Sequence, residues 1–418
     1  MNQFVQKKVF TLLLAVCLIV SNLTMAFAGP ESTPVVQAPS LTAIDSEIAT
    51  TAQYLKTSAN INAATDFYNS SKLLILLLRS GINCSDLIDS YLSQVSAAYI
   101  SNGELNLADP LTDYAYLSII LTLSGRNATN FNGINLIEKY ETAIANADQV
   151  TLNNINPYKL PHMYTSIYAY AKEFKDSATC LTKIKIAVLS YENENGIDYW
   201  GNSTDNNGFA LAGLSILSSS DSGVKKLAEN ALIFSQTLLQ SNGTSNGDFK
   251  WSAFSNSDST AASLTLYATY GKQDLAANSY AGLLTFKNSL QTGAYSYTNA
   301  ADVASSYSTI DALYSLLTYK SILANQSSPF DVSDKLASIS PPVINPEPET
   351  TAIAPPSTVD TTSTIATSSS TATPVDLTKT SPATGDSNIP TLFFLISLLS
   401  ACGIITLIYI PHYRKQTK

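Results

Sequence analysis

Apolar residues recur at helical spacing along most of the chain between residues 41 and 323. In one stretch the apolar positions are Val303, Tyr307, Ile310, Tyr314 and Leu317, which are alternately four and three residues apart. This spacing places them on one face of a helix. The run Leu73–Leu78 is apolar throughout, which predicts a helix buried on more than one side. Strand-like alternation is short and confined to loops that carry aromatic residues.

The periodic stretches predict about twelve helices. Their expected bounds are residues 41–57, 63–80, 85–99, 110–124, 133–147, 158–174, 177–191, 206–218, 222–240, 258–270, 273–290 and 302–323. Asp109 followed by Pro110 is typical of a helix start, because proline fits the first helical position. Gly81, Gly125 and Gly271 follow apolar helical stretches and predict helix ends, where glycine adopts a positive φ without strain.

One unit recurs along the chain: a loop with glycine and aromatic residues runs into a helix rich in small residues. Its clearest copies begin at Gly196–Trp200, Gly247–Trp251 and Gly293–Tyr297, with glycines about fifty residues apart. A weaker copy begins at Gly103, about two periods before Gly196. A period of this length predicts an array of helix pairs, with one pair in each repeat.

These helix pairs, joined by loops with glycine, an aromatic residue and then Ser/Asp-Thr-Ala, resemble the prenyltransferase and squalene-cyclase repeat. The resemblance covers about residues 41–325. It implies an all-α fold, an alpha/alpha toroid of about six helix pairs in which inner helices are surrounded by outer ones. Small residues such as Gly213 and Ala262 are expected to let the inner helices approach closely. The motifs are typical of the fold and do not specify an activity.

The first 28 residues have the pattern of a secretory signal peptide. Lys7 and Lys8 precede the apolar run Val9–Val20, and Ala26–Ala28 supplies small residues at a cleavage point. The apolar run is too short to span a bilayer, although an uncleaved anchor is the alternative. We therefore expect a secreted protein in which residues 29–40 form a spacer before the helical domain.

The C-terminal end has three parts in order. The pentapeptide Ser381, Pro382, Ala383, Thr384 and Gly385 precedes an apolar span at residues 389–410, and a short basic tail follows. The span is long enough to cross a membrane, and basic residues after it hold the tail in the cytoplasm. Residues 381–418 resemble the cell-wall sorting signals of Gram-positive bacteria, although the common motif has leucine where this chain has Ser381.

The resemblance of residues 381–418 implies a sortase and peptidoglycan as partners. The sortase would cleave between Thr384 and Gly385 and transfer Thr384 to peptidoglycan, so the expected location is the extracellular cell wall, reached through a membrane-bound intermediate. A simple tail-anchored membrane protein is the alternative. The class of sortase stays open.

The composition changes after the last predicted helix. Residues 326–380 are rich in proline, threonine and serine and almost lack aromatic residues, so they cannot bury enough apolar surface to fold. We expect a disordered stalk. The whole chain carries a formal net charge of −9. Residues 1–28 carry a net charge of +2, and so do residues 385–418. The part of the chain between them therefore carries −13. An acidic surface repels phosphate backbones, and nucleic acid is therefore excluded as a partner.

The repeat loops supply the candidate ligand-binding rim. Its residues are Trp200, Trp251, Tyr199, Asp205, Asp258 and Asp113. The two tryptophans have two interpretations: they fill space between neighbouring helix pairs, or they form a stacking platform for a sugar or another ring. Asp205 and Asp258 likewise are either helix N-caps or carboxylates that face a ligand.

The residues that known chemistries need are sparse in this chain. His162 and His412 are its two histidines, and His412 lies in the expected cytoplasmic tail. Neither His162 nor Cys180 has neighbours at metal-ligand spacing, so we expect no metal or cofactor. The Asp-x-Asp-Asp motif of squalene-type cyclases and a nucleophilic triad are missing from the sequence. Cys84 and Cys180 lie alone, either as buried thiols or as a disulfide.

Three functions remain after these exclusions. The favoured one is a surface protein that binds an extracellular glycan, protein or small molecule. The second is an enzyme that acts on polysaccharide or an isoprenoid-like substrate, because toroids host such enzymes and the rim carries carboxylates that a glycosidase needs in pairs. The third is an inert structural protein of the wall.

Overall fold

The structure is a computed structural model that describes residues 37–336, apart from residues 59, 219 and 248–253. This part of the chain is mostly α-helical, as predicted, with short two-residue strands in the loops. None of its helices is both long enough and apolar enough to cross a membrane. The predicted signal peptide, stalk and sorting signal, including Ser381, Pro382, Thr384 and Gly385, lie outside the described residues, and so does Trp251.

The helices follow one another along the chain with short connections. They are α2 (Leu41–Ser58), α3 (Phe67–Ser80), α4 (Ser85–Tyr99), α5 (Pro110–Leu123), α6 (Leu136–Asn146), α7 (Gln149–Asn153), α8 (Leu160–Ala169), α9 (Ser177–Leu189), α10 (Thr204–Leu211), the 3-10 helix η1 (Ala212–Leu214), α11 (Ser215–Ser218), α12 (Ser222–Leu238), α13 (Ser257–Thr269), α14 (Gln273–Leu284), α15 (Ser306–Leu323) and α16 (Ser333–Leu336).

The strands form three small antiparallel hairpins in the loops. They pair β1 (Ile100–Ser101) with β2 (Glu104–Leu105), β3 (Glu192–Asn193) with β4 (Gly196–Ile197), and β5 (Ser245–Asn246) with β6 (Ser255–Asn256). These are the glycine-aromatic loops in which the sequence places its only strand-like alternation. Gly103 and Gly196 adopt positive φ, which explains why the repeat begins with glycine.

Most helix bounds agree with the sequence prediction to within a few residues, but the helices predicted at 158–174 and 273–290 end earlier, at Ala169 and Leu284. Other differences have local causes. The segment predicted at 63–80 begins at Phe67, because the Asp66 carboxylate accepts a hydrogen bond from the Asn69 backbone N–H and caps the helix. The segment predicted at 206–218 is divided into α10, η1 and α11. Helices α7 and α16 were not predicted, since five and four residues are too few to show periodicity.

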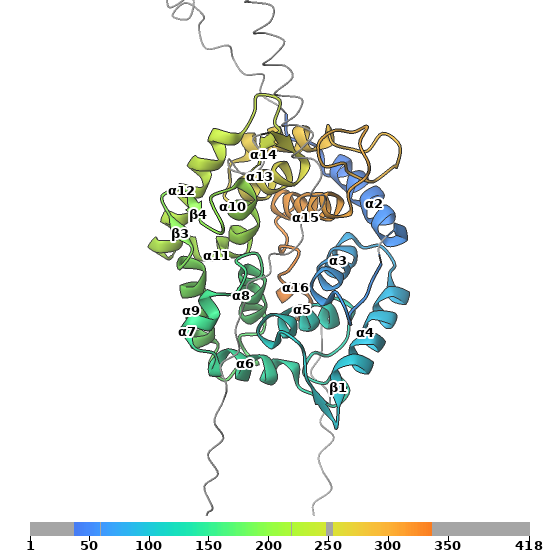
Figure 1. Cartoon of the computed structure of the whole chain (residues 1–418), viewed down its shortest axis with the longest axis vertical. Coiled ribbons are helices and arrows are strands. Elements are labelled where there is room, and N and C mark those ends of the chain that lie inside the picture. The colour runs from blue at the N-terminus through green and yellow to red at the C-terminus, as the bar shows by residue number, and fades with distance from the viewer. Residues whose placement is uncertain (1–36, 59, 219, 248–253, 337–418) are drawn as a thin grey trace, which may run out of the picture. The chain divides into compact units, whose positions relative to one another are not determined.

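Six helices make an inner series in which each contacts the next. In order these are α3, α5, α8, α10, α13 and α15, with η1 completing the contact between α8 and α10, and α15 contacts α3. Helices α6, α9, α12 and α14 pack on α5, α8, α10 and α13 respectively, and α2 packs on α15. Figure 1 shows the helices arranged around a common centre, with α16 drawn near it. Most residues of α5 and α13 are buried, as expected for helices packed on several sides.

Small residues bring inner helices into backbone contact. A Cβ atom added to Gly208 in α10 would lie 2.2 Å from the Ala262 carbonyl oxygen in α13. One added to Gly213 in η1 would lie 2.6 Å from the Pro161 carbonyl oxygen in α8. The close approach expected from Gly213 and Ala262 is therefore present. Cys84 and Cys180 are both buried and unpaired.

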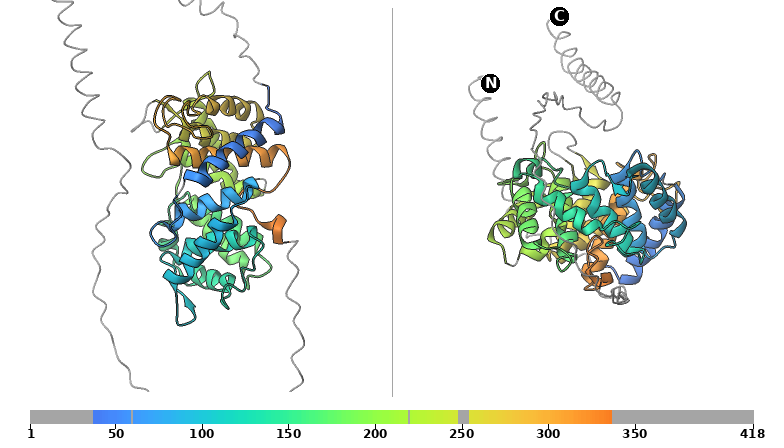
Figure 2. Two further views of the ribbon diagram at one scale, coloured as in Figure 1. Left: turned by 90° about the vertical axis from the view of Figure 1, so that its right-hand side faces the viewer. Right: turned by 90° about the horizontal axis from the view of Figure 1, so that it is seen from below.

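The chain continues past α15 into a tail segment, which we define as residues 326–336. This segment ends in α16, which lies at one surface of the helical body in the side views of Figure 2. Phe330 and Val332 of the segment are buried in the hydrophobic core. All of residues 326–336 were predicted to be stalk, and these two side chains instead belong to the folded domain.

Candidate functional site

The first turns of α10 and α13 carry two of the three acidic residues expected at the rim. Asp205 and Asp258 are each the second residue of their helix. The helix caps are instead Ser203 and Asn256, whose side chains accept hydrogen bonds from backbone N–H groups three residues later. The interpretation of Asp205 and Asp258 as N-caps was therefore wrong, because a serine and an asparagine in extended conformation already fill the cap positions.

A third acid, Asp311, lies in α15 and forms an ion pair with Lys72 of α3. Lys72 Nζ and Asp311 Oδ1 are 2.7 Å apart, and the two side chains are only 14% and 18% exposed. Burial lowers the pKa of Lys72, but the charge and hydrogen bond of Asp311, together with the charges of Tyr68 and Asp258, more than offset that effect and raise it overall. Lys72 is therefore a fixed positive charge beside this carboxylate.

Asp258 has a strongly perturbed carboxyl group. Burial, followed by the negative charges of Asp311 and Asp205, raises its pKa from the usual 3.8 to about 7. The Ser257 hydroxyl donates a hydrogen bond of 3.1 Å to Asp258 Oδ1. Asp258 can thus hold a proton near neutral pH. We call Asp205, Asp258, Asp311 and Lys72 the rim cluster.

Aromatic side chains adjoin the rim cluster from the loop before α8 and the loop before α10. The Tyr158 hydroxyl donates to Asn206 Oδ1 at 2.6 Å, and its ring meets the Tyr199 ring edge-on at 6.2 Å. Burial, then the charges of Asp205 and Asp311, raise the pKa of Tyr158 well above 10, so the phenol stays protonated and can act as a donor.

Trp200 does not fill space between helix pairs, as one interpretation expected. Its side chain is 64% exposed and stacks on Tyr199 with ring centroids 4.7 Å apart. Its backbone adopts a positive φ of 59°, which is uncommon for a bulky residue. Trp200 is thus exposed and Tyr199 is half-buried, and the alternative interpretation, a stacking platform for a sugar or another ring, stays a prediction.

Asp113 has a structural role at the start of α5. It is buried, and its carboxylate accepts a hydrogen bond of 3.1 Å from the Asp109 backbone N–H. Burial raises its pKa to about 6. Lys159 pairs with Asp109 at 3.2 Å and lies over the Tyr68 ring. The structure therefore places Asp113 beneath a charged surface group rather than on an open face.

Stacked aromatic residues fill the space between the inner helices. We call Tyr116, His162, Phe209, Tyr314 and Phe330 the aromatic core cluster. His162 and Phe330 stack with centroids 3.6 Å apart, and Phe209 stacks on Tyr314 at 5.6 Å. Lys72 Nζ lies 5.4 Å from the Phe209 ring and 5.8 Å from that of Tyr314, so the rim cluster adjoins this aromatic core. Burial, then the Lys72 charge, lowers the pKa of His162 well below 6.5 and keeps it neutral.

Sequence reasoning selected Asp205, Asp258 and Tyr199 but missed Lys72, Asp311 and Tyr158. The sequence did contain a signal for Asp311. In its repeat copy, Asp311 lies one helical turn beyond the position that corresponds to Asp258. Lys72 and Tyr158 come from segments outside the clear repeat copies, and only the fold brings them to the cluster.

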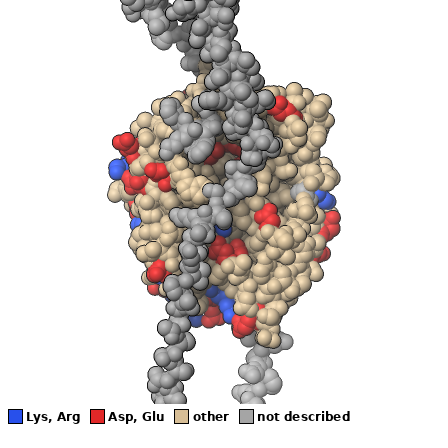
Figure 3. All heavy atoms as spheres, viewed as in Figure 1, with Lys and Arg blue, Asp and Glu red and all other residues tan. Residues whose placement is uncertain are grey.

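One face of the molecule carries more acidic than basic side chains, and some of the acidic ones lie near the middle of that face (Figure 3). Across the described residues, no group of three or more histidine, cysteine, aspartate or glutamate side chains is arranged to hold a metal ion. A scan of protein-family models finds no match for this chain, and a search of curated proteins finds none either.

Proposed function

We propose that this chain is a surface protein of a Gram-positive bacterium whose helical domain binds a carbohydrate at the rim cluster. In this proposal the six inner helices and their outer partners form an alpha/alpha toroid of the prenyltransferase and squalene-cyclase type. The contact between α15 and α3 supports this arrangement, since it joins the last inner helix to the first. The signal peptide and sorting signal would place the toroid outside the cell.

The observation that carries the binding proposal is the concentration of like charges at the rim. Asp205, Asp258 and Asp311 interact electrostatically, and Lys72 is the cation paired within the group. Such repulsion destabilises a fold, so groups held this way mark a functional site more often than a structural one. If the protein were an inert structural protein of the wall, the rim cluster would have no role that offsets its cost in stability.

Carbohydrate suits the chemistry of this site. Sugar hydroxyls donate hydrogen bonds to carboxylates, and the apolar faces of sugar rings pack on aromatic side chains. Asp205 and Asp258 would accept such bonds, and the stacked pair of Tyr199 and Trp200 would supply the aromatic face.

The binding proposal is tested with the full secreted chain on an array of bacterial and host polysaccharides. Asp258→Asn and Trp200→Ala should each weaken binding of any captured polysaccharide at least about tenfold, since each removes one direct contact. Asp89→Asn is the matched control, because Asp89 pairs with Arg126 on an exposed surface. An array without a captured polysaccharide, or equal binding by all four proteins, would contradict the proposal.

The second candidate is an enzyme that hydrolyses the bound polysaccharide, and the raised pKa of Asp258 favours it. A carboxyl group that is still protonated near pH 7 can donate its proton to a glycosidic oxygen while a second carboxylate, such as Asp205, activates water or attacks the sugar. Release of reducing ends should then fall as the pH rises above about 7. Asp258→Asn should abolish release while leaving some binding, whereas a pure binding protein would release none.

The isoprenoid alternative has less support than the carbohydrate one. An apolar chain would need room between the inner helices, where Phe330, His162 and Tyr116 are instead in contact.

A further inference from the structure

The tail segment sends one aromatic ring into the aromatic core cluster. Phe330 is 2% exposed and stacks on His162, with an interplanar angle of 22°. The edges of Tyr116 and Tyr314 meet its ring at 6.3 Å and 5.3 Å. Phe330 thus occupies a chamber with one stacking surface and two edge contacts, which is the geometry that aromatic pairs prefer.

Few other attachments hold the tail segment in place. Pro329, Phe330 and Val332 are its buried residues, and the rest are exposed or half-buried. Its backbone hydrogen bonds in the described chain are local, such as those from Asp331 N–H to the Ser328 carbonyl and from Lys335 N–H to the Val332 carbonyl. The segment is therefore joined to the helices through side chains and through the contact between α16 and α5, and residues 327–336 make no backbone-to-backbone hydrogen bond to another helix in the described chain.

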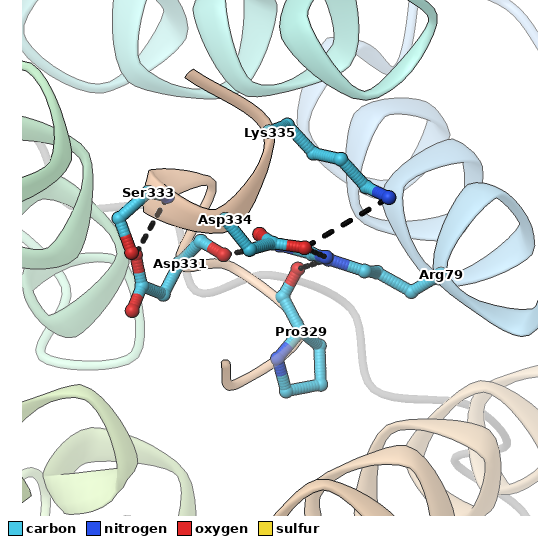
Figure 4. Close-up of polar contacts among 6 residues, drawn as sticks. All are labelled: Arg79, Pro329, Asp331, Ser333, Asp334 and Lys335. Atoms are coloured by element: carbon cyan, nitrogen blue, oxygen red, sulfur yellow. Dashed lines mark hydrogen bonds and ion pairs between the residues drawn. The ribbon is translucent and has the colours of Figure 1, made fainter. Parts of the chain in front are cut away.

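Arg79, in the last turn of α3, is the main polar attachment of the segment. Its guanidinium forms two hydrogen bonds of 3.0 Å to the Asp334 carboxylate, one of 3.0 Å to the Pro329 carbonyl, and another to the Asp331 carbonyl. Figure 4 shows Arg79 reaching across to Asp334 and Pro329, with Lys335 beside the same carboxylate. We call this arrangement the Arg79 latch.

The segment is also incompletely packed on one side. A cavity of about 440 Å³ lies between it and the ends of α3 and α15. Arg79, Lys320 and Ser321 line it from the helices, and Asn325, Pro329 and Asp334 line it from the chain after α15. Its lining is polar, so water can fill it. Water on this flank lowers the barrier to moving the segment, because its hydrogen-bonding groups need not cross an apolar region.

We propose that the tail segment is a displaceable plug and that the chamber around Phe330 binds a small planar aromatic molecule when the plug is withdrawn. Phe330 itself shows which chemistry fits: a flat aromatic ring between His162 and the edges of two tyrosines. Because His162 stays neutral there, an uncharged ring is the expected ligand. The proposal does not rest on carbohydrate binding at the rim, since the plug reaches the chamber from the tail segment.

The test uses the full secreted chain with indole as the probe. Arg79→Ala keeps Phe330 but removes the latch, and it should bind indole at least about tenfold more tightly than the unaltered protein, because apparent affinity rises with the fraction of molecules whose plug is withdrawn. Phe330→Ala should bind indole saturably in the vacated chamber. Arg126→Ala, which removes an exposed arginine paired with Asp89, should match the unaltered protein.

Hydrogen exchange provides the second measurement. In Arg79→Ala the amides of residues 326–336 should exchange at least about tenfold faster, while those of α5, α8 and α15 keep their protection. Asp334→Ala removes the carboxylate that Arg79 binds in the latch. It replaces Arg79→Ala in both measurements if Arg79→Ala fails to fold. Failure of Phe330→Ala to bind indole would overturn the ligand assignment. Loss of protection in the segment and the inner helices together would show that the segment is ordinary core.

Discussion

At the residue scale, the rim cluster makes the stability of the folded domain depend on pH. Asp258 has a folded-state pKa of about 7, above its usual 3.8. Its protonated form is therefore favoured in the folded protein, and the stability it contributes is fully present below about pH 4 and is lost as the pH rises through about 7. Asp113, with its pKa raised to about 6, acts in the same direction.

Asp258→Asn should make the protein more stable at pH 8, because asparagine resembles the protonated acid at every pH. We expect the unfolding temperature at pH 8 to rise by about 2–4 °C relative to the unaltered protein, with little difference at pH 4. Thermal unfolding at several pH values measures this, and comparison with the unaltered protein removes the common contribution of Asp113. A variant that is less stable at pH 8 would contradict the raised pKa.

Lys72→Met should destabilise the domain, since it leaves Asp311 half-buried without its partner and close to Asp258. We expect a loss of about 3 kcal/mol in the free energy of unfolding, measured with urea. The double variant Lys72→Met/Asp311→Leu should recover part of that loss. Lys175→Met is the control, because its pair with Glu138 is exposed and should contribute nothing measurable. Equal losses in Lys72→Met and in the control would contradict the importance of the buried pair.

About half of the candidate site was predictable from the sequence. Asp205, Asp258 and Tyr199 were found because they sit at fixed places in the repeat. Asp311 was visible but lies one turn away from the equivalent acids. Lys72 could not be found from the sequence, because it directly precedes the apolar run Leu73–Leu78 inside a predicted helix, and its partner is 239 residues away.

At the element scale, the fold depends on inner helices that touch through their backbones. Gly208→Ala should destabilise the protein by about 2 kcal/mol or more, because its Cβ would lie 2.2 Å from the Ala262 carbonyl oxygen and force α10 away from α13. Gly223→Ala in α12 is the control, since its nearest non-neighbour atom would be 3.3 Å away. It should be neutral or stabilising by about 0.5 kcal/mol. Urea unfolding of both variants measures the difference.

The helices themselves were largely predictable, because long amphipathic stretches with proline and glycine at their ends leave few alternatives. The 3-10 break in the segment that begins at Thr204 could not be predicted. It arises where Gly213 packs on the Pro161 backbone, and these two residues belong to helices that are distant in sequence. The tail segment was assigned to the stalk for a related reason: Phe330 and Val332 are isolated apolar residues in a polar stretch, and only the fold gives them a place to be buried.

At the scale of the whole molecule, the proposed signal peptide and sorting signal would decide where the folded domain operates. Thr384→Ala should release the protein from the wall fraction into the membrane fraction or the medium, because the sorting proposal requires cleavage after Thr384. Thr380→Ala is the matched control just outside the pentapeptide and should leave the protein in the wall fraction. Cell fractionation followed by immunoblotting measures both, and unchanged retention of Thr384→Ala would contradict the sorting assignment.

The place where the chain leaves the folded domain has a mechanical consequence. A load applied beyond Leu336 reaches Val332 and Phe330 before it reaches α15. It would peel these residues away one after another, whereas α15 would have to shear along its contacts with α13 and α2. In single-molecule stretching, the first event should lengthen the chain by about 40 Å, the extended span of eleven residues, at lower force than any later one. Tension alone would then expose His162, and a tethered protein would show a different surface when pulled than at rest.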